Sequence, residues 1–207
     1  MQLDPIKAAA QDAHETVTLR PCTLADAPAL ALVGAATFLE AFTWMLPGPD
    51  IILHAAKNHT VAAYEHYLAD PNTRITLALS SPAADFPDQP GAPVGYALLT
   101  APDLPTINVL PSDIELKRIY LFSRFRTVPV VDEDGNPIPN LRPAQALMDA
   151  SLADARTLNR TRLLLGTHAN NLRAIAFYRR NGFTEVGTRT FQVGSQTCSD
   201  LILARPL

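Results

Sequence analysis

Apolar and polar positions along the chain follow two periods, and the change from one to the other separates strands from helices. Short apolar or alternating runs predict strands at 16–20, 74–79, 94–99, 114–122, 163–166, 185–192 and 197–204. Apolar residues three or four positions apart predict helices from Leu24 to about Ala36 and at 60–69, 144–158 and 171–180. The segment Trp44–Pro49 breaks the first helix, and the Pro- and Ser-rich residues 80–92 predict a long surface loop.

This order of elements predicts an α/β or α+β protein with a mixed sheet. A length of 207 residues favours a single domain with a substantial core. We expect residues 1–15 to form a leader and 16–207 to form one domain. Residues 127–141 interrupt the pattern, and Asp134-Gly135 within them is a turn signal, so we expect an inserted hairpin there.

Composition narrows the classes of function. A formal net charge of −3 and 18% charged residues describe an ordinary soluble protein, with no basic excess that would indicate nucleic acid. The two cysteines are too few for a disulfide framework or a zinc site, and the five histidines show no metal-ligand spacing. The first residues lack a signal pattern and no apolar run approaches a membrane span, so we expect a cytoplasmic protein without a metal.

The segment from Asn171 to Phe183 combines several signals in a short space. Asn171 is a good helix N-cap, and Gly182 can end the helix in the left-handed conformation. A buried strand at 161–166 runs directly into this capped helix. Such a junction is where α/β proteins commonly place ligands.

The same segment resembles the C-terminal half of the GCN5-related N-acetyltransferase (GNAT) family, whose members carry Asn-x-x-Ala-x-x-Phe-Tyr-x-x-x-Gly-Phe. Residues 115–121 resemble the family's central strand, and 36–42 resemble its first-helix region more weakly. The resemblance extends from about Val17 to Leu203. It implies a single GNAT-like domain with helices on both faces of a mostly antiparallel sheet. The sheet splays after the central strand, and acetyl-CoA is the cosubstrate.

Acetyl transfer to an amine needs a proton for the leaving thiolate, and Tyr178 is the family's usual donor by resemblance. Glu115 stands on a strand that otherwise reads as buried. Its carboxylate can deprotonate an ammonium, bind a cationic substrate, or simply face solvent. Strand alternation places Glu115, Lys117 and Ile119 on one face and Arg118 on the other, and these cations argue for caution about a polyamine substrate. A backbone N–H near Leu121 is expected to polarise the carbonyl.

The resemblance also assigns binding positions. Substrate contacts are expected at Phe38 and Glu40, although an ordinary amphipathic helix end explains Glu40 equally well. Cofactor contacts are expected at Ile119, Tyr120, Leu121, Arg126, Arg142, Ala144, Gln145, Ala146, Asn171 and Phe177.

The chain departs from the family at the pyrophosphate loop, where Arg142 and Ala144 stand in place of two glycines and Pro143 lacks an N–H. In one interpretation the amides of residues 144–146 still bind the pyrophosphate, helped by Arg126 or Arg142, and the inserted hairpin is a flap. In the other, the anion site is closed and the protein is a non-catalytic binding or interaction protein. We expect the first: direct acetyl transfer to a small primary amine, in a monomer or in a homodimer paired through the closing hairpin. We expect no covalent enzyme intermediate, because neither Cys22 nor Cys198 is expected to lie in the cleft.

Overall fold

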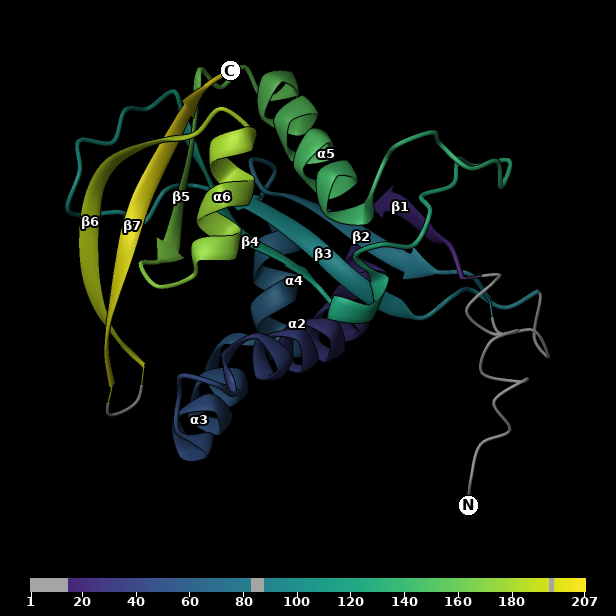
Figure 1. Cartoon of the computed structure of the whole chain (residues 1–207), viewed down its shortest axis with the longest axis horizontal. Helices are drawn as coiled ribbons and strands as arrows, with labels where there is room; N and C mark the ends of the chain where they lie inside the picture. Colours follow the sequence, from purple (N-terminus) through teal and green to yellow (C-terminus); the bar gives the residue numbers. More distant parts are fainter. Residues whose placement is uncertain (1–14, 83–87, 194–195) are drawn as a thin grey trace.

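A computed structural model describes residues 15–82, 88–193 and 196–207 (Figure 1). The predicted leader therefore lies almost wholly outside the described residues, as does the middle of the 80–92 loop. The described chain forms one seven-stranded sheet in the order β1-β2-β3-β4-β5-β7-β6. Only the β4–β5 pair is parallel, and the other five neighbouring pairs are antiparallel.

The strands span β1 Val17–Pro21, β2 Arg74–Ser80, β3 Pro93–Thr100, β4 Asp113–Leu121, β5 Arg162–His168, β6 Thr184–Val193 and β7 Gln196–Pro206. The helices span α2 Ala27–Phe42, α3 Gly48–Asn58, α4 Val61–Ala69, α5 Pro143–Thr157 and α6 Leu172–Arg180. Two short 3₁₀ turns, η1 Leu24–Asp26 and η2 Ser123–Phe125, precede α2 and follow β4.

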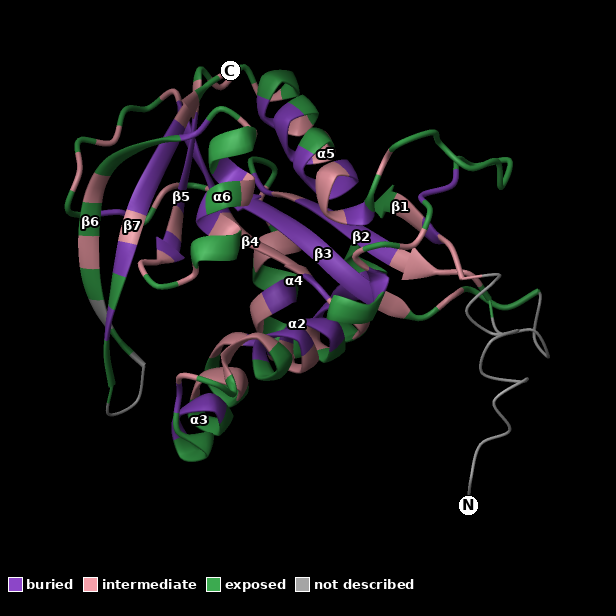
Figure 2. Cartoon of the chain, viewed as in Figure 1, coloured by how far each residue is buried: buried purple, intermediate pink, exposed green. Residues whose placement is uncertain are grey.

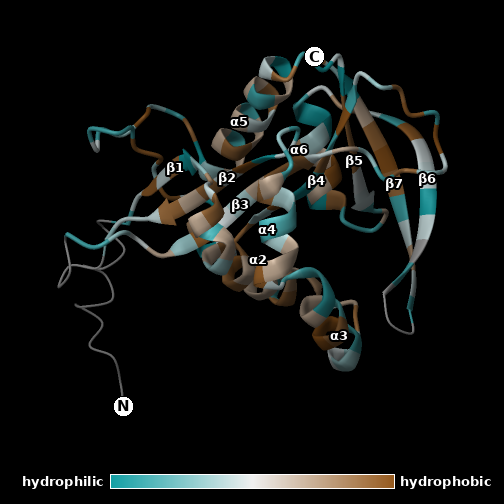
Figure 3. Ribbon diagram, turned by 180° about the vertical axis from the view of Figure 1, so that it is seen from behind, coloured by the Kyte–Doolittle hydropathy of each residue, from teal (hydrophilic) through white to brown (hydrophobic). Residues whose placement is uncertain are grey.

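Helices cover both faces of the sheet. Helices α5 and α6 lie on one face, where Leu147, Met148 and Tyr178 join the main apolar core. Helices α2 and α4 lie on the opposite face, where Leu30 and Tyr64 form a second core with β2 and β3 (Figures 1 and 3). The central strand β3 is buried along almost its whole length (Figure 2) because it has a core on each side. The predicted mixed α/β fold is confirmed.

All seven predicted strands are present, but one helix was not predicted. Trp44–Pro49 was expected to be a break, with no helix between it and residue 60. The break is real, yet α3 begins within it at Gly48, with Pro49 in its first turn. Proline is tolerated in a first turn, where its missing N–H has no intrahelical acceptor. Helix α2 already ends at Phe42, and the prolines at 47 and 49 belong to the start of α3.

We expected no apolar run to approach the length of a membrane span. By length and composition alone, one helical stretch does. Leu24–Phe42 is long and apolar enough to pass such a test. In the fold this stretch packs Leu30 and Val33 into the core beneath β2 and β3, as a core helix of a globular domain does.

Strands β4 and β5 separate soon after they begin. They are paired only from Asp113–Arg162 to Glu115–Leu164, and beyond these residues no β4–β5 pairing continues. Just beyond these residues, Lys117 is an extra residue in β4 relative to β3. Leu116 is opposite Leu99 and Arg118 is opposite Leu98, which leaves Lys117 without a partner in the register. This β-bulge corrects the predicted alternation. Leu116 and Ile119 now share the α5 face, while Arg118 turns toward α4.

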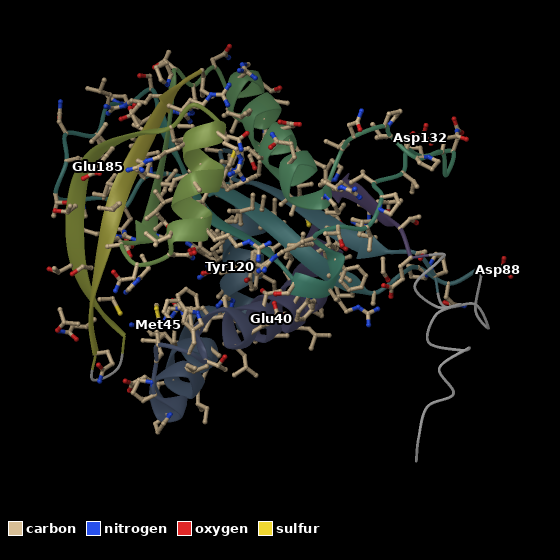
Figure 4. The ribbon with its side chains drawn as sticks, in the orientation of Figure 1. Glu40, Met45, Asp88, Tyr120, Asp132 and Glu185 are labelled. Carbon is tan, nitrogen blue, oxygen red and sulfur yellow. The ribbon has the colours of Figure 1, made fainter. Side chains whose placement is uncertain are left out.

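The inserted segment 127–141 lies along the free side of β1 rather than over the sheet's centre. It forms two isolated bridges, Val17–Val130 and Val131–Pro137, in place of a regular hairpin ladder. The predicted turn is present: Gly135 has a φ of 81°, and the Asp132 carboxylate accepts two backbone N–H groups across it. Figure 4 shows Asp132 on this loop, well away from Tyr120.

Candidate active site

A cavity of about 820 Å³ opens where β4 and β5 separate. One wall is β4 from Leu116 to Leu121, and another is α6 with the end of β5. Helices α2 and α3 close the cavity below, and the start of α5 closes it at the other end. Figure 4 shows Glu40, Met45 and Tyr120 gathered around this region. Because β4 has lost its partner here, its edge offers unpaired backbone groups to an extended ligand.

Tyr178 reaches the cavity from α6. Its ring is 8% exposed and packs edge-on against Phe177 and Phe183, with centroids 5.6 and 5.9 Å away. Burial raises the pKa of the Tyr178 hydroxyl above its ordinary value, and nearby Tyr120 adds to the shift. The phenol therefore stays protonated at neutral pH and remains available as a proton donor.

Glu115 is nearly fully buried and does not line the cavity. Its carboxylate accepts the Asp103 backbone N–H at 2.8 Å and lies 3.5 Å from the Lys117 ammonium. Burial raises the pKa of Glu115, while Lys117 opposes the shift. Lys117 itself does line the cavity and also pairs with Asp103 at 3.4 Å. A group in the cavity thus meets Lys117 before it meets Glu115.

The N-terminus of α5 faces the opposite end of the cavity. Ala146 donates its N–H to Arg142 O at 2.9 Å and is not among the lining residues, which removes it from the predicted anion site. Ala144 and Gln145 do line the cavity, and no acceptor for their backbone N–H groups is found among the described residues. Two amides at a helix N-terminus therefore remain for an anion, against the three that were predicted.

Side chains hold this end of α5 in place. Gln145 donates to Asn181 at 2.8 Å and so joins the start of α5 to the end of α6. The Arg142 guanidinium donates to the Thr127 carbonyl and anchors the return of the inserted segment. Asn171 caps α6 by accepting the Ala174 N–H at 3.2 Å, and it also lines the cavity.

Among the described residues, basic side chains outnumber acidic ones around the cavity. The acidic residues are Glu40, Asp103 and Asp200, and the basic residues are Lys117, Arg118, Arg126, Arg142, Arg173, Arg180 and Arg189. Burial and the charge of nearby Arg173 lower the pKa of Arg126. The cavity is therefore built for a ligand that carries negative charge.

The end of the cavity beside α2 and α3 is aromatic. Phe38, a predicted substrate contact, is buried and stacks on His54 with centroids 4.1 Å apart. Glu40, the other predicted contact, accepts the Ser123 N–H and hydroxyl, so its carboxylate fastens α2 to the turn after β4. Tyr120 and Phe42 meet edge-on at 6.4 Å, and burial raises the pKa of Tyr120 to about 12.

The expectation that neither cysteine lies in the cleft was wrong for Cys198. This side chain is 4% exposed and lines the cavity from β7, beside the Arg189–Asp200 ion pair. Burial and the nearby Asp200 raise the pKa of Cys198, so its thiol stays protonated and is a weak nucleophile.

Several lining residues were not predicted as site residues. His54 belongs to the missed helix α3, and Arg189 and Asp200 come from the closing hairpin, where only distant strand pairing brings them to the cavity. Arg173 lies inside the recognised helix motif, two residues after the Asn171 cap, and its charge was the available signal. Among the described residues no group of three or more metal-ligating side chains occurs.

Comparison with known proteins supports the geometry. A family model described as "Acetyltransferase (GNAT) family" matches residues 143–183, which are α5, β5 and α6. An uncharacterised N-acetyltransferase of Mycobacterium tuberculosis is 30% identical over 184 residues, covering 89% of this chain and 99% of that protein. The chain belongs to the GNAT family. It is an acetyl-CoA-dependent N-acetyltransferase.

Solved structures show the same GNAT fold. The PaiA N-acetyltransferase of Thermoplasma acidophilum, solved with coenzyme A, superposes with a TM-score of 0.62 at 13% identity, over 93% of this chain and 99% of that one. A ribosomal-protein-alanine N-acetyltransferase of Brucella melitensis gives 0.60 at 21% identity, over 91% and 99%. The residues present here fit the cosubstrate: free amides of α5 and several arginines suit phosphates, and the open β4 edge suits the pantetheine arm.

Proposed function

We propose that this GNAT enzyme acetylates a small primary amine by direct transfer, with Tyr178 as the general acid. The observation that carries the proposal is the separation of β4 and β5 beneath a buried, protonated phenol. Bound acetyl-CoA supplies the reactive thioester carbonyl. The acetyl carbon exchanges its bond to sulfur for a bond to nitrogen, the amine loses one proton, and sulfur takes up another.

The roles of the residues follow from their places around the cavity. The β4 edge near Leu121 offers backbone N–H groups that orient and polarise a carbonyl. Ala144 and Gln145 offer two backbone N–H groups to a diphosphate. Arg126 and Arg173 add positive charge, in place of the further backbone contacts that glycines would allow in the pyrophosphate loop. We keep Arg142 as a contact as well, because it lines the cavity at the N-cap of α5.

Glu115 is proposed to assist amine deprotonation indirectly. Its carboxylate is separated from the cavity by Lys117, so a proton would pass through Lys117 or through water. A buried carboxylate with a raised pKa is suited to accept a proton near neutral pH. Direct transfer also fits Cys198, whose protonated thiol disfavours a covalent acetyl-enzyme.

The inserted segment is proposed to brace the site rather than to cover it. Its residues 129–131 lie beside β1, and only its end reaches the cavity, through Asn140 and the adjoining Arg142. Two further proposals concern the setting of the enzyme. Its free cysteines fit a reducing cytoplasm, and β6, an edge strand, is the surface through which two chains would pair.

The test is release of free CoA thiol from acetyl-CoA in the presence of a panel of small primary amines. Tyr178→Phe keeps the buried ring but loses the hydroxyl. We expect turnover to fall about ten-fold or more, with acetyl-CoA affinity in calorimetry unchanged. Unchanged turnover would remove Tyr178 from the mechanism. A protein that binds acetyl-CoA but acetylates none of the amines would contradict the small-amine acceptor.

A further inference from the structure

Arg118 is a half-buried cation that forms no ion pair with an acidic side chain of the described residues. Its Nη1 atom is fully buried and has no hydrogen-bond partner. Among the described residues no carboxylate forms an ion pair with it, and its guanidinium lies 5.6 Å from the ring centroids of both Tyr64 and Tyr67. Aromatic faces compensate only part of the cost of removing such a charge from water. An anion brought by a ligand would complete the pairing.

The surrounding groups hold Arg118 in place without neutralising it. The Tyr64 hydroxyl is hydrogen-bonded to the Tyr96 hydroxyl at 2.8 Å and to the imidazole of His59 at 2.9 Å. All three side chains are buried, so the ring beneath the guanidinium is fixed from two sides. Arg118 is therefore held at the cavity wall in a fixed environment, which is what recognition of a specific group requires.

The other charged side chains at this end of the cavity already have ion-pair or hydrogen-bond partners. Lys117 lies between the carboxylates of Asp103 and Glu115, and Arg189 pairs with Asp200 at 3.0 Å. Glu40 is engaged by the turn after β4. Arg118 thus remains as an uncompensated charge beside the acceptor, and a polycation placed there would meet repulsion.

The neighbouring wall is apolar. Phe38, Phe42, Met45, Leu46 and Tyr120 line the cavity beside α2 and α3. An acceptor that fills this end would present an apolar group to these side chains and a negative group to Arg118. Its amine would then point toward the separated strands.

Resting on the proposed acetylation of a small amine, we propose that the acceptor is an amino acid with an apolar side chain, whose carboxylate pairs with Arg118. Arginine suits this task because its planar fork binds a carboxylate through two N–H groups. The carboxylate would anchor the substrate, while the side chain selects among amino acids through the aromatic wall.

The experiment compares matched pairs that differ only in the carboxylate: phenylalanine with phenethylamine, and leucine with 3-methylbutylamine. For wild-type protein we expect kcat/KM at least about ten-fold higher for the better amino acid than for its decarboxylated amine, mainly through KM. Arg118→Gln should abolish this ratio while leaving kcat/KM for the amine within about two-fold. Arg180→Gln, another lining arginine on the exposed part of α6, is the control and should keep the ratio.

The possible outcomes distinguish a failure of the Arg118 inference from a failure of the proposed acetylation of a small amine. If amines are acetylated as well with as without a carboxylate, the Arg118 inference is overturned and the enzyme activity stands. If acetyl-CoA binds but no member of either pair reacts, both the small-amine acceptor and this inference fail. If Arg118→Gln does not fold, inhibition of the wild-type protein tests the same contact. 3-Phenylpropanoate should inhibit competitively with respect to the amino acid, and 3-phenylpropanamide should not. Equal inhibition by both compounds would refute the carboxylate contact.

Discussion

His59 makes the stability of this protein depend on pH. Its imidazole is 6% exposed, and burial, together with the nearby charge of Arg118, lowers its pKa from 6.5 to about 3. The Nδ1 atom is hydrogen-bonded to the Tyr64 hydroxyl at 2.9 Å, and that hydroxyl is in turn hydrogen-bonded to Tyr96 at 2.8 Å. Nε2 has no partner in the described structure, and an added proton there would be a buried, unpaired cation.

The magnitude follows from the two pKa values. Below pH 6.5 the unfolded chain takes up a proton at His59, but the folded protein does not until the pH approaches 3. Stability is therefore present above pH 6.5 and lost as the pH falls through this window. Between pH 7.5 and 5.0 the loss from this one group is about 2 kcal/mol.

The assay is urea unfolding at a series of pH values from 7.5 to 5.0. Burial also raises the pKa values of Glu115 and Asp200, so the informative quantity is the difference between wild-type protein and His59→Gln. Between pH 7.5 and 5.0 the free energy of unfolding of His59→Gln should fall by about 2 kcal/mol less than that of wild type. This difference does not depend on how stable the variant is at pH 7.5. His66→Asn on exposed α4 surface is the matched control and should follow wild type. Parallel pH profiles for wild type and His59→Gln would refute the reasoning.

Three further predictions concern the site. Glu115→Gln should lower kcat at neutral pH several-fold and shift the acidic limb of the pH–rate profile; an unchanged profile would assign Glu115 a purely structural role. Arg173→Gln should weaken CoA binding in calorimetry by about 1 kcal/mol or more and reduce its salt dependence, whereas Arg179→Gln, on the same helix outside the cavity lining, should not. Replacing residues 130–139 with a short glycine loop should destabilise β1 and weaken CoA binding through loss of bracing, and tighter binding would show that the insertion obstructs the site.

Most of the fold was predictable because local signals and tertiary structure agree. The strand periods, the Asn171 cap and the Asp134-Gly135 turn each require only neighbouring residues, and each is present in the structure. Helix α3 was not predicted because a proline can interrupt a helix or stand in its first turn. Only the packing of Ile51 against Phe38 shows that the second case applies here. The bulge at Lys117 was equally hidden, since its cause is the register with β3.

The site was predictable only where it coincides with a contiguous motif. Tyr178 and Asn171 stand in one helix and line the cavity together, as expected. Arg118 was noted on its strand but its environment was not, because Tyr64 and Tyr67 belong to a helix about fifty residues earlier in the chain. Cys198 was expected outside the cleft, but the β5–β7 pairing brings β7 to the cavity, and Cys198 lines it.

The central claim is that two amides of α5, with arginines in place of glycines, bind the diphosphate of acetyl-CoA at the mouth of the β4–β5 opening. Calorimetric titration of the intact protein with acetyl-CoA tests it most directly. We predict one site per chain with a dissociation constant below about 1 mM, weakened as salt is raised. An absence of binding heat at several temperatures, together with no shift in melting temperature at millimolar acetyl-CoA, would contradict the account.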